Sequence, residues 1–150
     1  IGDIQIQTPT PLHVDIVFMM KNGECPSDEL IAAVDAAVKN SAKKSLNDYI
    51  TVNKPETVDY EINIKYYINE SDRSKAAEIQ KAVVEAVESY KQWQSEKIGR
   101  DISPWKLIYH IISTGAKRVE IISPTATTIA AGKVANCTSQ SVQYGGIEDD

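Results

Sequence analysis

The stretch Tyr49–Ile68 reads YITVNKPETVDYEINIKYYI, and its second half is the most regular pattern in the chain. Within Tyr60–Ile68 every second residue is apolar, which is typical of a β-strand with one buried face. A shorter strand, Ile50–Val52, precedes it and ends at Lys54-Pro55. Because proline cannot donate a hydrogen bond to a neighbouring strand, the pattern predicts an edge position for the short strand and a central position for the long one.

Further strands and helices are predicted on both sides of this stretch. A strand over Leu12–Met20 precedes a helix that Ser27 caps. Apolar residues at helical spacing predict a long helix after the central strand, and Ser103-Pro104 starts another helix, which ends at Gly115. A last strand, Arg118–Ile122, is followed by Ser123-Pro124. The apolar faces of the three predicted helices consist of Leu30, Ile31, Val34 and Val38; of Ile79, Val83, Val87 and Tyr90; and of Leu107, Ile108, Ile111 and Ile112.

The order of these elements is strand, helix, strand, strand, helix, helix, strand. It predicts the α+β class: a duplicated βαβ unit arranged as a ferredoxin-like split βαβ sandwich, with an extra helix in the second repeat and a C-terminal strand or tail. The first and third strands would be central in one sheet. The second and fourth, each followed by proline, would lie at its edges.

Three segments follow from this interpretation. Residues 1–11 are predicted to be a linker from a missing upstream domain, because the chain opens on Ile1 rather than Met. Residues 12–125 would form the duplicated βαβ domain, and residues 126–150 a C-terminal extension. Removal of Gln140–Asp150 is then expected to leave folding nearly unchanged, because the domain would already be closed by Ile122.

Composition limits the class of partner. A chain of 150 residues with a formal net charge of −5 has the size of one soluble domain and lacks the surplus of Lys and Arg that binding through nucleic-acid phosphates requires. No apolar run approaches the length of a membrane span, and the start has no signal-peptide pattern. Cys25 and Cys137 belong to no CxxC motif and are predicted to be free thiols in a reducing compartment.

Residues that carry chemistry are scattered. His13 and His110 each stand apart from other potential ligands, and the chain has no nucleophile elbow and no glycine-rich phosphate loop. Tyr66 and Tyr67 on a central strand suggest base stacking, but the glycines and basic residues of an RNA-binding sheet are missing. The sequence therefore predicts no catalytic residue, no cofactor and no metal site.

The carboxy-terminal segment offers a candidate contact with another protein. Val142 and Tyr144 alternate with Gln143, so Ser139–Tyr144 could be a strand that joins the sheet of a neighbour. Val142, Gln143 and Tyr144 are the predicted contact residues. An ordinary disordered terminus is the alternative.

Five ordered segments together carry a resemblance to a known family. They are PTPLHVDIVF, PSDELIAAVDAAV, SLNDYITVNKPETVDYEINIKYYI, AVVEAVESYKQWQSEKIGRDISPWKLIYHIISTGAKRVEIISPT and SVQYGGIEDD. In this order and spacing they resemble the carboxy-terminal part of the phage baseplate J-like family, from about Pro9 to Asp150. That family's strand-ending proline falls on Pro55, and its helix-start pattern falls on Gly99, Ile102 and Ser103. At Gly115-Ala116 alanine stands where the family usually has valine.

The resemblance implies a structural wedge subunit of a contractile phage tail or of a tail-derived particle. Its partners would be other baseplate wedge subunits and further copies of itself, with no nucleic acid and no membrane. It would be assembled in the bacterial host cytoplasm and reside in the baseplate. Two other functions stay open from the residues: a ferredoxin-like module that binds or senses a small molecule, which ligand-induced thermal stabilisation would reveal, and an enzyme, which a substitution-sensitive hydrolase activity would reveal.

Overall fold

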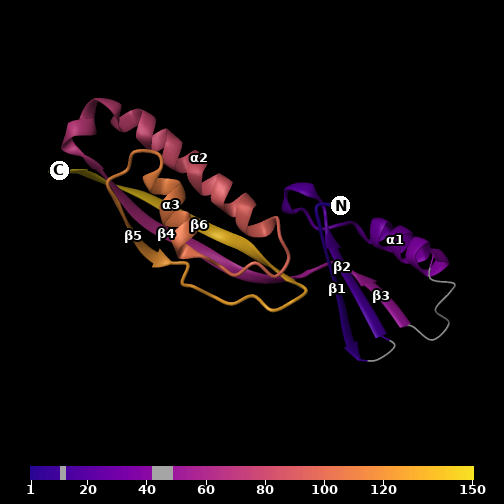
Figure 1. Cartoon of the computed structure of the whole chain (residues 1–150). Helices are drawn as coiled ribbons and strands as arrows, with labels where there is room; N and C mark the ends of the chain where they lie inside the picture. Colours follow the sequence, from indigo (N-terminus) through magenta and orange to yellow (C-terminus); the bar gives the residue numbers. More distant parts are fainter. Residues whose placement is uncertain (11–12, 42–48) are drawn as a thin grey trace.

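The computed structural model describes residues 1–10, 13–41 and 49–150, and it consists of two lobes joined by one chain crossing at Lys54-Pro55 (Figure 1). The amino-terminal lobe, residues 1–53, contains β1 (Asp3–Thr10), β2 (His13–Met19), the 3-10 turn η1 (Lys21–Gly23), α1 (Asp28–Ser41) and β3 (Tyr49–Asn53). The carboxy-terminal lobe, residues 56–150, contains β4 (Glu56–Asn69), η2 (Glu70–Lys75), α2 (Ala76–Ser95), α3 (Pro104–Ile112), β5 (Arg118–Ser123) and β6 (Lys133–Glu148).

The amino-terminal lobe is a three-stranded sheet in the order β1-β2-β3, with one helix on one face. β1 is antiparallel to β2, and β3 is parallel to β2 because α1 carries the chain back between them. The Ser27 hydroxyl accepts a hydrogen bond from the Leu30 amide at 3.2 Å, which confirms the predicted helix cap. The core under α1 is small: its buried members are Ile16, Phe18 and Val52.

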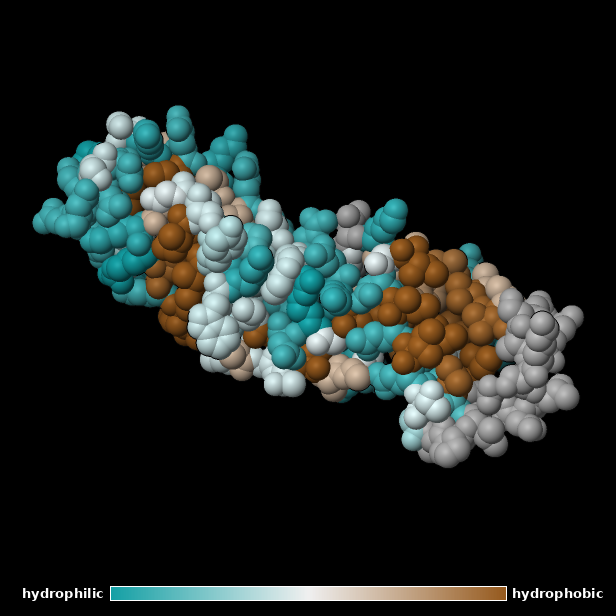
Figure 2. Space-filling view, in the orientation of Figure 1, coloured by the Kyte–Doolittle hydropathy of each residue, from teal (hydrophilic) through white to brown (hydrophobic). Residues whose placement is uncertain are grey.

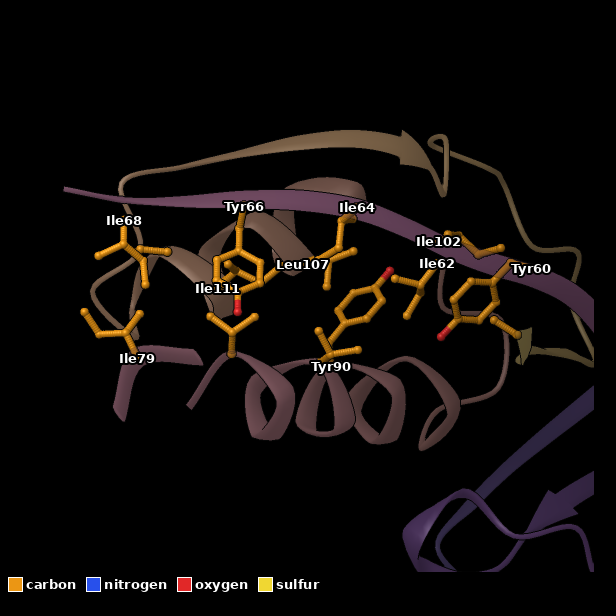
Figure 3. Packing of buried hydrophobic residues seen from close by; sticks show 14 of the residues in the cluster. Tyr60, Ile62, Ile64, Tyr66, Ile68, Ile79, Tyr90, Ile102, Leu107 and Ile111 are labelled. Carbon is orange, nitrogen blue, oxygen red and sulfur yellow. The ribbon is translucent and has the colours of Figure 1, made fainter. Parts of the chain in front are cut away.

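The carboxy-terminal lobe is a second three-stranded sheet, in the order β5-β4-β6, with two helices on one face. β4 is its central strand, antiparallel to β5 and parallel to β6. Figure 3 shows Ile62, Ile64 and Ile68 pointing from β4 towards the helices, as the alternation in the sequence predicts. These side chains pack with residues of α2 and α3 in the main core, which includes Val83, Val87, Tyr90, Leu107 and Ile111.

A buried amide fixes the connection between α2 and α3. Gln94 is fully buried near the end of α2, and its Nε2 donates to the carbonyl oxygens of Arg100 and Asp101 at 3.2 and 2.9 Å. Its Oε1 accepts from the Ser103 amide and the Tyr90 hydroxyl at 3.2 and 3.1 Å. Because all four contacts satisfy polar groups near the core, this side chain determines where α3 begins.

The mixed α+β content is confirmed, but the predicted single ferredoxin-like sheet is wrong for these strands. β2 and β4 are central and β3 and β5 are edges, as predicted, yet each central strand belongs to a sheet of its own. The reason lies at Lys54-Pro55, where the chain passes from β3 into β4 without folding back beside β2. β6 occupies the place next to β4 that the prediction gave to β2.

Both terminal segments contribute strands. Within residues 1–11, predicted as a linker, β1 pairs with β2 from Asp3 onwards. Within residues 126–150, predicted as an extension, β6 pairs along β4 from Glu56 to Asn69. Because Gln140–Glu148 pair with Ile62–Asn69 of β4, we expect removal of Gln140–Asp150 to disturb the fold, contrary to the expectation from the sequence.

The two lobes are joined by polar side chains of β1 and by a small apolar cluster. The Asp3 carboxylate accepts a hydrogen bond from the Ile98 amide at 2.7 Å. The Gln5 amide donates to the Ile98 carbonyl at 2.9 Å and accepts from the Gly132 amide at 2.8 Å. Met19, Ile98 and Val134 are buried between these contacts. Asp3 and Gln5 therefore act as a clamp that fixes one lobe against the other.

Candidate functional site: the free edge of β6

The three predicted contact residues lie on one strand but on different faces of the sheet. Val142 is opposite Ile64 in the register and is half-buried against the main core. The Tyr144 ring stacks on the Tyr66 ring, with 5.5 Å between centroids, so it also belongs to the helix-covered face. Gln143 points the other way and is exposed. Of the three side chains, Gln143 and the 37% exposed part of Tyr144 are accessible to a partner, whereas Val142 is half-buried.

The backbone edge of β6 is the more informative feature. The described sheets have four edge strands, β1, β3, β5 and β6. β1 contains Pro9, β3 is short and ends before Lys54-Pro55, and β5 carries Arg118 and Glu120 and ends before a proline. Proline, charge and short length are the features that protect sheet edges from pairing with other chains.

β6 lacks proline, charge and short length as protection along most of its extent, although its pairing with β4 shifts register at two places, after Tyr60 and after Tyr66. It is 16 residues long, and Val134–Ile147 contains neither a charged residue nor a proline. One side of β6 pairs with β4, and no strand of the described residues pairs with the other side. β6 therefore presents a long row of backbone donors and acceptors for an additional strand.

The end of β6 is held in place by an ion-pair network. Arg118 on β5 donates to Glu148 at 2.5 and 2.9 Å and to Glu120 at 2.8 Å, and these hydrogen bonds hold the pKa values of both carboxyl groups below their ordinary range. The Arg118 guanidinium also lies 3.9 Å from the centre of the Tyr67 ring. A side chain at Gly145 would collide with that ring, since its Cβ would come within 2.4 Å. The geometry fixes β6 as an ordered edge.

The candidate chemical residues stay apart. His13 Nε2 lies 2.9 Å from Asp15 Oδ1 on β2. His110 lies on α3, where burial and the neighbouring Lys106 lower its pKa below its ordinary value. Among the described residues no group of His, Cys, Asp and Glu is arranged to hold a metal ion.

The two cysteines are closer than the sequence indicates. Cys25 and Cys137 are free thiols, and both line a hollow of about 620 Å³ that lies between α2, β6 and the segment after η1. Burial raises the pKa of the Cys137 thiol, which disfavours the reactive thiolate. Their shared location could not be predicted, because it depends on how the two lobes meet.

The helices of the described residues give no candidate for a membrane crossing, since none combines the necessary length and apolar character.

Comparison with known proteins identifies the family. The chain belongs to the Baseplate J-like family, because residues 60–143 match the Baseplate J-like protein C-terminal domain. This range begins within β4 and ends within β6, so it comprises most of the carboxy-terminal lobe. Proteins of this family are structural components of phage tails and not enzymes. The resemblance stated from the ordered sequence segments is thereby confirmed.

One relative extends the similarity to the amino-terminal lobe. The chain is 29% identical to Baseplate protein J of Escherichia phage P2 over an alignment of 151 positions, which covers 99% of the chain. The same alignment covers 49% of the relative, so the chain spans about half of that protein's length.

Proposed function

We propose that this chain is a structural part of a baseplate wedge subunit in a contractile phage tail or tail-like particle. Its family and its similarity to Baseplate protein J of phage P2 support a structural role in the baseplate. It acts through protein–protein contacts with other wedge subunits and with further copies of itself, without nucleic acid or membrane. It is assembled in the bacterial host cytoplasm and ends in the baseplate of the particle.

The observation that carries the proposal is the unprotected edge of β6. An extended segment of a neighbouring baseplate subunit pairs with this edge and continues the sheet beyond β6. Main-chain hydrogen bonds supply the affinity in such a contact, and side chains beside them supply selectivity. The exposed Ser139 and Gln143 flank the new strand on the face away from the helices.

The test is to place charges on this edge without disturbing the pairing with β4. Ser139 lies opposite Glu61 and Gln143 opposite Lys65, so Ser139→Lys with Gln143→Glu adds two charges that the neighbouring strand can accommodate. In the full-length protein we expect this double variant to keep its melting temperature but to be incorporated poorly into particles, measured by subunit content after purification.

A matched control is Ala126→Lys with Ala130→Glu, the same charges at the same spacing on the exposed connection between β5 and β6. It should assemble as the unmodified protein does. Normal incorporation of the β6 double variant would remove this edge from the interface.

A further inference from the structure

The amino-terminal sheet has fewer helices than its width requires. A helix is about 10 Å across and strands lie about 4.8 Å apart, so one helix covers about two strands. α1 packs against β3 and against the buried residues of β2, which leaves β1 beyond its cover. Ile4 and Ile6 are opposite Phe18 and Ile16 in the register and therefore lie on the same face as α1, yet they are 48% and 63% exposed.

The flank of α1 next to β1 continues this apolar surface. Asp28 pairs at 3.5 Å with Lys54, directly after β3, so the Asp28 side of the helix faces β3. Ala33 and Ala37 lie on the other flank by helical periodicity, and both are exposed. We call Ile4, Ile6, Leu30, Ala33 and Ala37 the β1 surface. Figure 2 shows hydrophobic side chains gathered over this lobe.

The carboxy-terminal lobe carries a complementary ridge on α3. Leu107 and Ile111 are buried on one side of this helix. Trp105, Tyr109 and Ile112 form a stripe on the opposite side, where Trp105 and Tyr109 are 68% and 64% exposed. Exposed Trp and Tyr are among the residues that most often anchor interfaces. We call these three residues the α3 stripe.

The charges beside the two surfaces are opposite. The chain has no acidic residue between Asp101 and Glu120, and the Lys106 ammonium lies 5.2 Å from the centre of the Tyr109 ring. On α1, Glu29 lies one helical turn before Ala33 in a first turn that is acidic. In a chain with net charge −5, α3 thus carries Lys106 and no acidic side chain, whereas the first turn of α1 beside the β1 surface is acidic.

We propose that the α3 stripe of one copy packs on the β1 surface of a second copy, with Lys106 close to Glu29 of that copy. α3 then takes the position of the second helix that the amino-terminal sheet lacks. Because the two surfaces differ, the contact is head-to-tail and repeats from copy to copy, which gives a closed ring or an open row. This contact deepens the proposed function. It is argued from the two surfaces, and only its location in a baseplate particle rests on the proposed function.

The test uses two variants that each destroy one half of the contact. Ile6→Lys removes the β1 surface and Trp105→Lys removes the α3 stripe, and both positions are exposed enough to leave the fold intact, which the melting temperature checks. The unmodified chain should associate as its concentration rises in sedimentation velocity. Each variant by itself should stay monomeric. An equimolar mixture should form 1:1 dimers and nothing larger, because one intact contact remains.

The matched control is Ile122→Lys, which replaces an isoleucine that is 71% exposed on β5, outside both surfaces, and should associate like the unmodified chain. An unmodified chain that stays monomeric up to about 1 mM, the range of weak specific contacts, overturns the inference. Variants that associate like the unmodified chain, or a mixture without dimers, overturn it as well. These outcomes concern the purified chain, so they are separate from the incorporation test of the β6 edge.

Discussion

The two lobes contain the same number of strands but differ in how they are covered. The carboxy-terminal sheet has two helices on one face and buries a continuous core, whereas the amino-terminal sheet has one helix and leaves Ile4 and Ile6 exposed. Burial of apolar area is the main source of folding free energy. The comparison indicates that the carboxy-terminal lobe has the larger core, and that the amino-terminal lobe leaves apolar surface exposed that the proposed contact between copies would cover.

The strongest test of this comparison is to delete an edge strand from each lobe. Removal of Gln140–Asp150 takes away the half of β6 that pairs with Ile62–Asn69 of β4 and exposes part of the main core, so we expect loss of the cooperative fold of the carboxy-terminal lobe. Removal of residues 1–10 should leave that lobe folded, because its sheet has the order β5-β4-β6 and contains no strand from these residues. Near-ultraviolet circular dichroism and amide exchange at β4 distinguish the two results. If the chain without Gln140–Asp150 kept slow amide exchange at Ile62 and Ile64, the core of the carboxy-terminal lobe would not depend on this half of β6.

A second test compares one leucine from each lobe. Leu107 on α3 is fully buried, whereas Leu30 on α1 is half-buried. Leu107→Ala should lower the free energy of unfolding by about 2–5 kcal/mol through the cavity it creates. Leu30→Ala should lower it by about 1 kcal/mol, because less apolar area is lost. Chemical denaturation measures both. If both substitutions lowered the free energy of unfolding equally at protein concentrations where copies associate, the β1 surface, which includes Leu30, would be covered in solution.

A third test concerns the clamp between the lobes. Gln5→Ala leaves the Ile98 carbonyl and the Gly132 amide without their partner, which should cost about 1–3 kcal/mol. We expect faster amide exchange at Gly132, with little change in the middle of β4. Gln7→Ala, two residues along the same strand face, serves as the control. Unchanged exchange at Gly132 would mean that the apolar cluster of Met19, Ile98 and Val134 holds the lobes without Gln5.

The smallest expected effect is a dependence on pH from His110. Burial and the nearby Lys106 lower its pKa in the folded chain below the value of about 6.5 in the unfolded chain. The unfolded chain therefore binds the proton more readily, and this contribution to stability is complete above about pH 6.5 and is lost as the pH falls through the folded value. His110→Asn should flatten the stability profile in that window. A profile identical to that of the unmodified chain would show that His110 is solvated.

Much of the carboxy-terminal lobe could be predicted from local patterns. The alternation in Tyr60–Ile68 predicted the buried face of β4, and Ser103-Pro104 predicted the start of α3, where the Ser103 hydroxyl accepts from the Lys106 amide at 3.3 Å. These features succeed because strand faces and helix caps depend on residues close in sequence. β1 was missed because its alternation is short: only Ile4 and Ile6 are apolar before Thr8 and Pro9, and residues 1–11 were interpreted as a linker.

The candidate sites also include one that the sequence predicted in part and others that it did not predict. The sequence predicted a strand near Val142, Gln143 and Tyr144 as a contact, but the contact proposed from the structure is the backbone edge of β6, whose exposure depends on which strand lies beside it. The β1 surface and the α3 stripe were not predicted. The spacing of apolar residues predicts which face of a helix or strand is apolar, but it does not predict whether another element covers that face.

By itself, the sequence determined the order and type of most elements, the faces of β4 and α2, the scarcity of chemical groups and the resemblance to the Baseplate J-like family. Only the tertiary structure decided that the strands form two sheets, that Asp3 and Gln5 join the lobes, and that β6 keeps a free edge. The physical reason is that strand pairing uses backbone groups common to all residues. Which strands meet therefore depends on the path of the whole chain, and side-chain periodicity leaves it open.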